Sequence, residues 1–163
     1  MPIKTFNIFF LFILEPNCTI ITSTFKFSFT GYEYEKKAKK ELEKLGLSYH
    51  DEYELRSKGF DKTPDIKLDI PFAYKGLVIN WIESKALFGD EQNHKKYLKD
   101  QLLTYYNRFG PGLVIYWFGF IEELDINREQ GILICDHFPQ KQNIEFWNPL
   151  KEFSTEDNSE AED

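Results

Sequence analysis

The spacing of apolar positions changes along the chain, and each spacing predicts a different element. After Thr30, apolar side chains recur at the three-to-four-residue spacing of a helix, at Tyr34, Ala38, Leu42 and Leu45. Thr30 and Glu33 have the spacing of a capping box, which satisfies the first free amide groups of a helix. Gly46 supplies a stop signal. We therefore predict a helix that begins at Thr30 and ends at Gly46.

The next segments have the length and composition of strands. Residues 66–70, 72–74 and 77–84 are short runs rich in apolar side chains, separated by Pro71 and by a Lys-Gly turn. Because their connections are short, they are expected to form an antiparallel meander.

A second helix and a buried strand follow the meander. Residues 94–108 return to helical spacing and end before Gly110. Residues 112–120 (GLVIYWFGF) are too apolar for a half-exposed strand, so a central strand buried on both faces is expected. Residues 122–129 are expected to form a short helix or turn, and 131–135 a last strand. The order α-β-β-β-α-β, with a right-handed crossover onto a parallel strand, predicts an α/β protein with a mixed central sheet flanked by helices.

The two ends of the chain differ from this pattern and suggest a division into three parts: 1–30, 31–139 and 140–163. The apolar run Ile8–Leu14 is too short to span a bilayer as a helix. It fits a signal peptide with Lys4 before it and the sequon Asn17-Cys18-Thr19 after it, an added strand, or an alternative start or gene-model error. We favour an alternative start or gene-model error, because the segment does not share the residue pattern of 31–139.

Composition narrows these possibilities only a little. A chain of 163 residues suits one domain, and two cysteines make neither a disulfide framework nor a zinc cluster. The formal charge of −7 is concentrated in the last stretch, KEFSTEDNSEAED, which has the composition of a disordered tail. The remainder is close to neutral and has lysine clusters, so the charge is compatible with nucleic-acid binding.

Candidate chemistry lies where two of the predicted strands begin and end. Glu83 and Lys85 are two residues apart and therefore point to one face of a strand, and Asp65 precedes a neighbouring strand. Two carboxylates bind a hard divalent cation through oxygen, and an adjacent lysine can orient water or balance charge on a phosphate. Each part of this pattern also has an ordinary structural explanation. Glu83 and Lys85 have the spacing of an exposed ion pair at a strand end, and Asp65 follows a proline as in a common Pro-Asp turn.

Three further residues are candidates for support of this site. Gln101 and Tyr105 are four apart, on one face of the second helix, where they either reach the site or pack at the rim of the core. Glu35 lies on the flank of the apolar face of the first helix. Such a carboxylate either points inward to a partner such as a metal ion or reaches solvent beyond an apolar stem.

The combination of strand-borne Asp, strand-borne Glu-x-Lys, helix and strand resembles the PD-(D/E)xK nuclease superfamily. The strings KGFDKTPD, WIESKA-x-FGDE and NRFGPGLVIYWFGFIEELD are similar to its TPD-type, codanin-interacting nucleases, over about residues 32–139. This resemblance implies a restriction-endonuclease-like core, with Asp65, Glu83 and Lys85 as the catalytic residues. The Gln101-x-x-x-Tyr105 pair resembles an element of the RecB-like branch. Residues 1–30 and the acidic end do not resemble the long helical N-terminal region and the ending of such proteins.

Together these features predict a DNA phosphodiesterase that uses one or two Mg²⁺ ions, or Mn²⁺. Asp65, Glu83 and the Ser84 carbonyl are expected to hold the metal, with Glu35, Gln101 and Tyr105 in support. Several lysines are candidates for phosphate binding, although solvated helix faces explain them equally well: Lys36, Lys39, Lys95 and Lys99. The resemblance also implies a codanin-like partner, a nuclear and cytoplasmic location and a role in erythroid differentiation. The alternatives are an interaction protein with little or no catalysis, and a secreted protein. No membrane association is expected.

Overall fold

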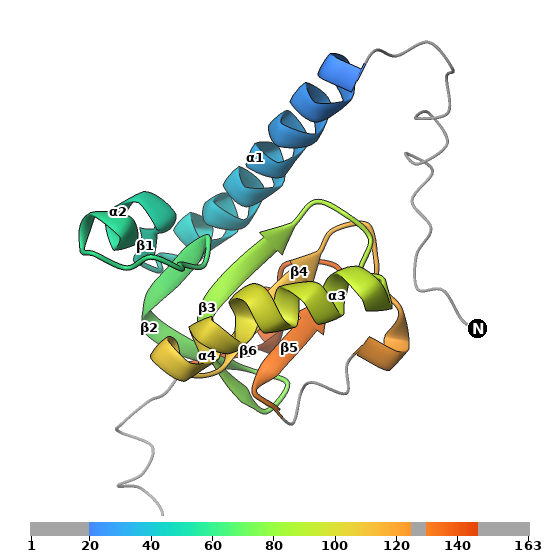
Figure 1. The fold of residues 1–163 in the computed structure, drawn as a ribbon. Coiled ribbons are helices and arrows are strands. Elements are labelled where there is room, and N and C mark those ends of the chain that lie inside the picture. The colour runs from blue at the N-terminus through green and yellow to red at the C-terminus, as the bar shows by residue number, and fades with distance from the viewer. Residues whose placement is uncertain (1–19, 125–129, 147–163) are drawn as a thin grey trace, which may run out of the picture.

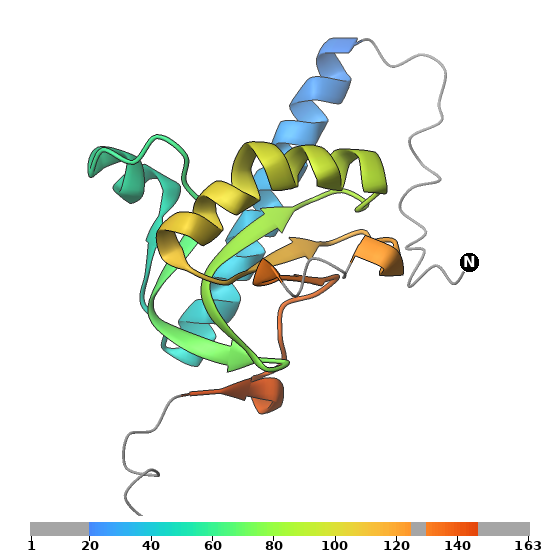
Figure 2. The same ribbon diagram turned by 60° about the horizontal axis from the view of Figure 1, so that its bottom comes forward.

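The computed structural model describes residues 20–124 and 130–146, with side chains from residue 30 onward. Its sheet runs in the order β1-β2-β3-β4-β5, and β6 pairs with β2 on a side branch. One long helix, α1, lies on one face of this sheet, and a continuous helical segment lies on the other (Figures 1 and 2).

The elements are α1 Ile20–Leu45, β1 Tyr49–Asp51, α2 Glu52–Ser57, β2 Ile66–Tyr74, β3 Leu77–Lys85, α3 Glu91–Tyr97, the π-helical turn η2 Leu98–Leu102, α4 Leu103–Phe109, β4 Gly112–Tyr116, β5 Ile132–Cys135, the 3₁₀ turn η4 Lys141–Asn143 and β6 Ile144–Glu145. The predicted α/β class and the mixed sheet flanked by helices are confirmed.

Helix α1 ends as predicted but begins earlier. Gly46 has a left-handed backbone (φ 71°), and its amide donates to the Glu43 carbonyl while that of Leu47 donates to the Leu42 carbonyl. These two bonds satisfy carbonyls at the helix end. The predicted start at Thr30 is wrong, because the helix already runs from Ile20. A capping box marks the start of a helix only where the preceding backbone is not helical. Here residues 20–29 are already helical, so Thr30 and Glu33 lie inside the helix.

Strand β2 is longer than predicted. Its nine residues include Pro71, at which we expected a break. The proline instead coincides with a shift in the pairing with β3, between Lys67 and Phe72. A proline has no amide hydrogen to donate, so the ladder is interrupted while the extended backbone continues. β1 and α2 were not predicted, since elements of three and six residues leave little periodic signal.

The crossover onto a parallel strand is confirmed. β3 and β4 pair in parallel, with Ile82 opposite Leu113, and the segment 91–109 connects them over one face of the sheet. All five residues of β4 are buried, as its apolar composition predicted. The strand ends at Tyr116 rather than at Phe120, because the chain turns at Gly119 (φ 88°). Helix α3 begins at Glu91, three residues before the predicted start, where the Asp90 side chain accepts from the Asn93 amide at 2.9 Å.

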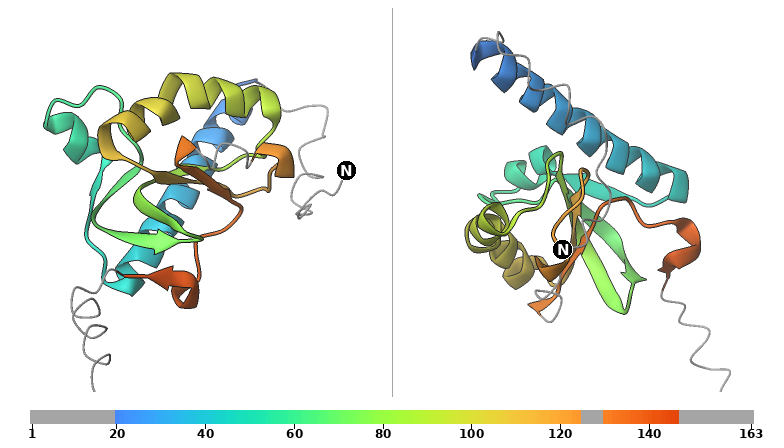
Figure 3. Two further views of the ribbon diagram at one scale, coloured as in Figure 1. Left: turned by 90° about the horizontal axis from the view of Figure 1, so that it is seen from below. Right: turned by 90° about the vertical axis from the view of Figure 1, so that its right-hand side faces the viewer.

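The sheet separates two apolar cores. The helices that cover them lie on opposite sides of the sheet in a side view (Figure 3). Ala38 and Leu42 of α1 are fully buried against one face. Trp81 on β3 packs with Leu102 and Tyr105 on the other face. A β-carbon on Gly112 would lie 2.0 Å from the Trp81 ring, so only glycine lets β4 approach that side chain. Two packed cores make β3 a rigid base for the groups at its end.

Some predicted features fall outside the described residues: the apolar run Ile8–Leu14, the acidic tail and most of 122–129, of which 122–124 form a 3₁₀ turn. Among the described helices, none has the length and apolar character needed to cross a membrane.

Candidate active site

The start of β2 and the end of β3 bring two carboxylates together. Antiparallel pairing sets Ile66 opposite Ile82, so Asp65 lies beside Glu83. The Asp65 amide donates to Glu83 Oε2 at 3.2 Å, and the Ser84 amide donates to Asp65 Oδ2 at 2.8 Å. Each acid is thus held by the backbone of the other strand. The predicted proximity of these residues is confirmed.

Lys85 completes the cluster from the same face of β3. Its Nζ donates to Glu83 Oε1 at 2.6 Å and to Gln101 Oε1 at 3.1 Å. Only 13% of the Lys85 side chain and 5% of the Glu83 side chain are exposed. The ammonium therefore joins the end of β3 to the helical segment that covers it. We call Asp65, Glu83 and Lys85 the strand-end cluster.

The electrostatics of the strand-end cluster show an excess of negative charge. Burial raises the pKa of Asp65 well above its usual value, and the charge of Glu83 adds to this shift. Burial also raises the pKa of Glu83, and Lys85 only partly offsets it. Burial acts to lower the pKa of Lys85, but Glu83 and Asp65 more than compensate, so that this pKa is raised too. All three groups hold protons more tightly than in water, the two acids chiefly because they are buried and Lys85 because Glu83 and Asp65 lie beside it.

The spacing of Gln101 and Tyr105 left two alternatives open, and each residue meets one: Gln101 reaches the strand-end cluster, while Tyr105 packs in the apolar core next to it. Gln101 contacts Lys85 directly. Tyr105 is 3% exposed, and its ring packs edge-to-face on Trp81 at 5.4 Å between centroids. Burial and the charges of Glu83 and Asp65 raise the pKa of Tyr105 far above its usual range. Its phenol therefore stays protonated and can act only as a neutral hydrogen-bonding group.

Glu35 lies near Asp65 but is paired with another side chain. Lys39 donates to Glu35 Oε1 at 2.6 Å and lies 3.9 Å from Asp51. The charge of Glu35 nevertheless contributes to the raised pKa of Asp65. Glu35 is thus a neighbour of the strand-end cluster. A role in metal binding, like that of the Ser84 carbonyl, stays a prediction.

The four predicted phosphate-binding lysines are in different situations. Lys36, Lys95 and Lys99 are exposed, and Lys95 donates to Glu91 at 2.6 Å. Lys39 is half-buried between Glu35 and Asp51. Lys39 therefore neutralises carboxylates within the fold. Phosphate binding by all four lysines stays a prediction.

The loop that carries Asp65 is tied to the covering helices, which no pattern in the sequence predicted. Lys62 Nζ donates to the Asp100 carbonyl at 2.8 Å. Arg108 donates to the Lys62 carbonyl at 2.7 Å and to Asp61 Oδ1 at 3.1 Å. These contacts join residues 38 to 47 positions apart, so no local spacing could reveal them.

Three more side chains at the site were also missed. The face of the Tyr97 ring lies 4.5 Å from Lys85 Nζ. Trp117 Nε1 donates to the Ser84 hydroxyl at 2.8 Å, on the opposite face of β3. The Thr63 hydroxyl is buried and makes no hydrogen bond within the described part of the chain. The Thr-Pro-Asp string was the available signal for Thr63, and the four-residue spacing from Gln101 was the signal for Tyr97.

The donors of this cluster fit a hard cation. Carboxylate oxygens are the ligands that Mg²⁺ prefers, usually one or two of them with water and substrate oxygens completing the shell. Within 20–124 and 130–146, no group of three or more His, Cys, Asp or Glu could hold a metal ion. The candidate donor set is therefore a carboxylate pair, Asp65 and Glu83, in which burial raises both pKa values.

Comparison with known proteins places the chain in a family. The sequence profile described as "Protein of unknown function TPD sequence-motif" matches residues 12–138, which include the whole strand-end cluster. The chain belongs to this TPD family.

Named relatives extend the comparison. The chain is 59% identical over 110 residues to the CDAN1-interacting nuclease 1 of Xenopus laevis, 58% over 109 residues to that of Homo sapiens, and 65% over 88 residues to that of Gallus gallus. The alignments cover 68%, 67% and 54% of this chain but only 36%, 39% and 32% of the relatives. This TPD-family chain thus spans little more than a third of their length. No solved structure matches it.

Proposed function

We propose that this chain is a metal-dependent nuclease that hydrolyses phosphodiester bonds of DNA, built on a restriction-endonuclease-like core. The observation that carries the proposal is the strand-end cluster: two carboxylates and one ammonium at the end of β3, all with raised pKa values. The printed name of the relatives, a nuclease, agrees with it.

Asp65 and Glu83 would hold Mg²⁺ or Mn²⁺, with the Ser84 carbonyl as a further donor. A bound divalent ion supplies Lewis-acid stabilisation of phosphate charge and lowers the pKa of coordinated water. The backbone amides of Asp65 and Ser84 keep the two carboxylates in place before any ligand arrives. This preorganisation reduces the reorganisation that the reaction requires.

Lys85 would act on the attacking water or on the developing phosphate charge. Its ammonium has three donors, of which Glu83 and Gln101 accept two. The third is free to turn toward a water or a phosphate oxygen. Gln101 would hold the lysine in this orientation, and the protonated Tyr105 would provide a neutral hydrogen-bonding group near Glu83. The exposed lysines Lys36, Lys95 and Lys99 would add salt-sensitive contacts to backbone phosphates.

A cleavage assay tests this proposal. The wild-type chain and the variants Asp65→Asn, Glu83→Ala and Lys85→Ala are incubated with single-stranded, duplex and branched DNA, with Mg²⁺, with Mn²⁺ or with a chelator. We expect metal-dependent cleavage by wild type and a loss of about 100-fold or more in each variant, the usual effect of removing one catalytic group.

Asp65→Asn is the most informative of the three, because an amide keeps the shape of the side chain. Lys58→Ala, an exposed lysine near α2, is the matched control and should cleave like wild type. Equal activity in wild type and all three site variants would refute the catalytic assignment.

A second candidate function rests on the relatives' printed name, which also describes an interaction with CDAN1. We propose that the chain binds a codanin-like protein and that this binding is separate from catalysis. The proposed location is the nucleus and cytoplasm, and the proposed process is erythroid differentiation. Co-purification of the strand-end variants with codanin would distinguish the two functions. Binding that survives Asp65→Asn while cleavage is lost would assign them to different surfaces.

A further inference from the structure

The ammonium of Lys85 is held from more than one side. Glu83 and Gln101 accept hydrogen bonds from it at 2.6 and 3.1 Å, and the Tyr97 ring lies 4.5 Å from the same nitrogen. A positive charge within about 6 Å of the centre of an aromatic ring is attracted by the negative face of that ring. Tyr97 therefore provides a third attraction that needs no hydrogen bond.

This third contact matters because lysine is a flexible residue. Its four-carbon stem has a large rotamer entropy, so one or two hydrogen bonds leave it free to exchange partners. In the strand-end cluster, Asp65 competes with Glu83 for the same ammonium, since its charge also acts on Lys85. A ring on one side restricts the nitrogen to positions between Glu83 and Gln101.

The shape of the helical segment explains how Tyr97 and Gln101 reach the same nitrogen. In an α-helix, four residues advance about 400°, or about 40° beyond a full turn, so side chains at spacings of four drift around the helix. The π-helical turn η2, Leu98–Leu102, lies between α3 and α4. Its hydrogen bonds reach one residue further, so it winds more slowly and offsets part of that drift. Tyr97 and Gln101 consequently both face β3.

Tyr97 is itself held in place. It packs against the apolar core around Trp81 and is the last residue of α3. The adjacent β4 residue Tyr116 is fully buried and bonded to His94 at 2.9 Å, and Tyr97 lies close enough to influence it electrostatically. The ring is thus part of the packed layer that covers the strand-end cluster.

We propose that Tyr97 is a positioning residue for Lys85: its ring face keeps the ammonium between Glu83 and Gln101. The aromatic ring carries this role and the hydroxyl does not, so phenylalanine should replace tyrosine. The effect on DNA cleavage rests on the proposed nuclease function, whereas the effect on Lys85 itself does not.

Nuclear magnetic resonance of the full chain provides the first test. In wild type, ring currents of Tyr97 should shift the ε-methylene protons of Lys85 upfield of those of exposed lysines. The order parameter of Lys85 Cε should be high in wild type and in Tyr97→Phe, and lower in Tyr97→Leu and Tyr97→Met. Tyr53→Leu is the control, since Tyr53 is 80% exposed on α2.

Cleavage kinetics provide the second test. We expect Tyr97→Leu to lower kcat about 2- to 30-fold, the range of a cation–π attraction, with little change in KM. Tyr97→Phe should restore kcat. If Tyr97→Leu does not fold, Tyr97→Met carries both measurements.

Three results would overturn the proposal: no upfield shift in wild type, equal Cε order parameters in the Phe and non-aromatic variants, or equal kcat in those variants. A wild-type chain that does not cleave DNA would refute the nuclease proposal, while the Cε measurement would still decide the role of Tyr97.

Discussion

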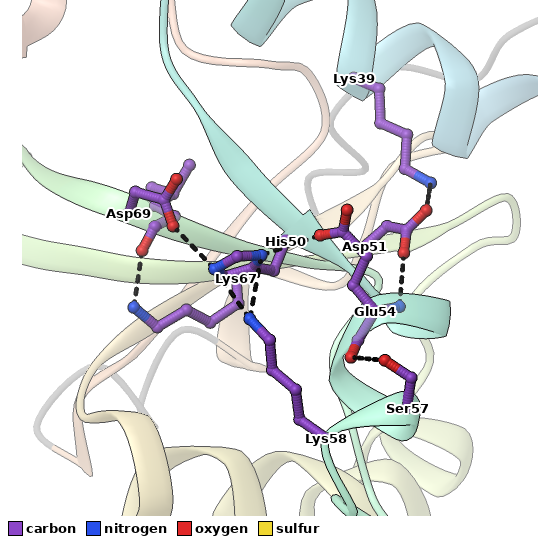
Figure 4. Close-up of polar contacts among 9 residues, drawn as sticks. Lys39, His50, Asp51, Glu54, Ser57, Lys58, Lys67 and Asp69 are labelled. Carbon is purple, nitrogen blue, oxygen red and sulfur yellow. Dashed lines mark hydrogen bonds and ion pairs between the residues drawn. The ribbon is translucent and has the colours of Figure 1, made fainter.

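Two clusters of charged side chains lie on neighbouring parts of the sheet and are built in opposite ways. The strand-end cluster is covered by helices and has two acids for one ammonium. The second, which we call the edge cluster, lies by β1 and α2 (Figure 4), and its side chains are partly exposed. Its members are Lys39, His50, Asp51, Glu54, Lys58, Lys67 and Asp69.

The edge cluster balances its charges. His50 lies between Glu54 at 2.8 Å and Asp69 at 3.2 Å, and Lys39 lies between Glu35 and Asp51. The side chains of Glu54 and Asp69 are 53% and 38% exposed, against 5% for Glu83. Each acid there has a nitrogen beside it and water to screen it, so the arrangement stores little energy. The strand-end cluster retains buried charge that its own residues do not neutralise, which is typical of a site made for a ligand.

The largest expected contrast concerns the lysines. Lys85→Met should destabilise the chain by about 3–5 kcal/mol at neutral pH, because it leaves two buried carboxylates without their ammonium. Lys58→Met in the edge cluster should change the free energy of unfolding by less than about 1 kcal/mol. Urea denaturation measures both.

The loss in Lys85→Met should shrink at acidic pH, as Asp65 and Glu83 take up protons. Equal destabilisation by the two lysine variants would remove the distinction between the clusters.

The two histidines give the next contrast. Burial lowers the pKa of His94, which is 1% exposed, whereas the His50 side chain is 36% exposed. A lowered pKa means that the neutral ring stabilises the fold above the unfolded value of 6.5, and that this stability is lost as pH falls below it. We expect wild type to lose stability below pH 6.5 more steeply than His94→Gln, by up to about 1.4 kcal/mol per pH unit.

Urea denaturation at a series of pH values measures the two slopes. If His94→Gln and wild type respond alike, the buried ring is not the source of the acid sensitivity.

The smallest contrast concerns two aspartates and has an unusual sign. The pKa of Asp65 is raised, so its contribution to stability is complete below the unfolded value of 3.8 and is lost as pH rises through the folded value. At neutral pH the Asp65 carboxyl therefore costs stability relative to a carboxyl with an unshifted pKa. Asp65→Asn should stabilise the chain, on the order of 1 kcal/mol, while abolishing cleavage.

Thermal and urea unfolding at about pH 7 and pH 3 check this sign, since pH 3 lies below the unfolded pKa of 3.8 and pH 7 lies above it. The stabilisation by Asp65→Asn should disappear at pH 3. The control Asp69→Asn should show no stabilisation at pH 7 or at pH 3. A destabilised Asp65→Asn at neutral pH would contradict the account of the strand-end cluster.

Much of this site could be predicted because it depends on strand periodicity. Glu83 and Lys85 lie on one face of β3 since strand side chains alternate, and the pairing of short-connected strands brought Asp65 beside them. The buried β4 and its parallel pairing followed from composition and connection length. Gln101 was found through the four-residue spacing of a helix.

The parts that were missed depend on contacts distant in sequence or on a local change of period. The π-helical turn has no clear sequence signature, so the four-residue spacing from Gln101 was a signal for Tyr97 but did not fix the approach of its ring to Lys85. The contacts of Arg108 with the Asp65 loop arise only after β2 and the helices have packed. The start of α1 was misplaced because Thr30 and Glu33 imitate a cap inside a helix.

The strand-end cluster is short of positive charge, and we propose that a divalent cation supplies it. Thermal unfolding of wild type and Asp65→Asn, with and without Mg²⁺ in the millimolar range, tests this proposal, with Asp69→Asn as the control. A ligand present at about 100 times its Kd stabilises the folded state by about 2.7 kcal/mol. The account predicts that Mg²⁺ raises the Tm of wild type and of Asp69→Asn but leaves Asp65→Asn unchanged. An equal rise in all three proteins, or no rise in wild type, would contradict it.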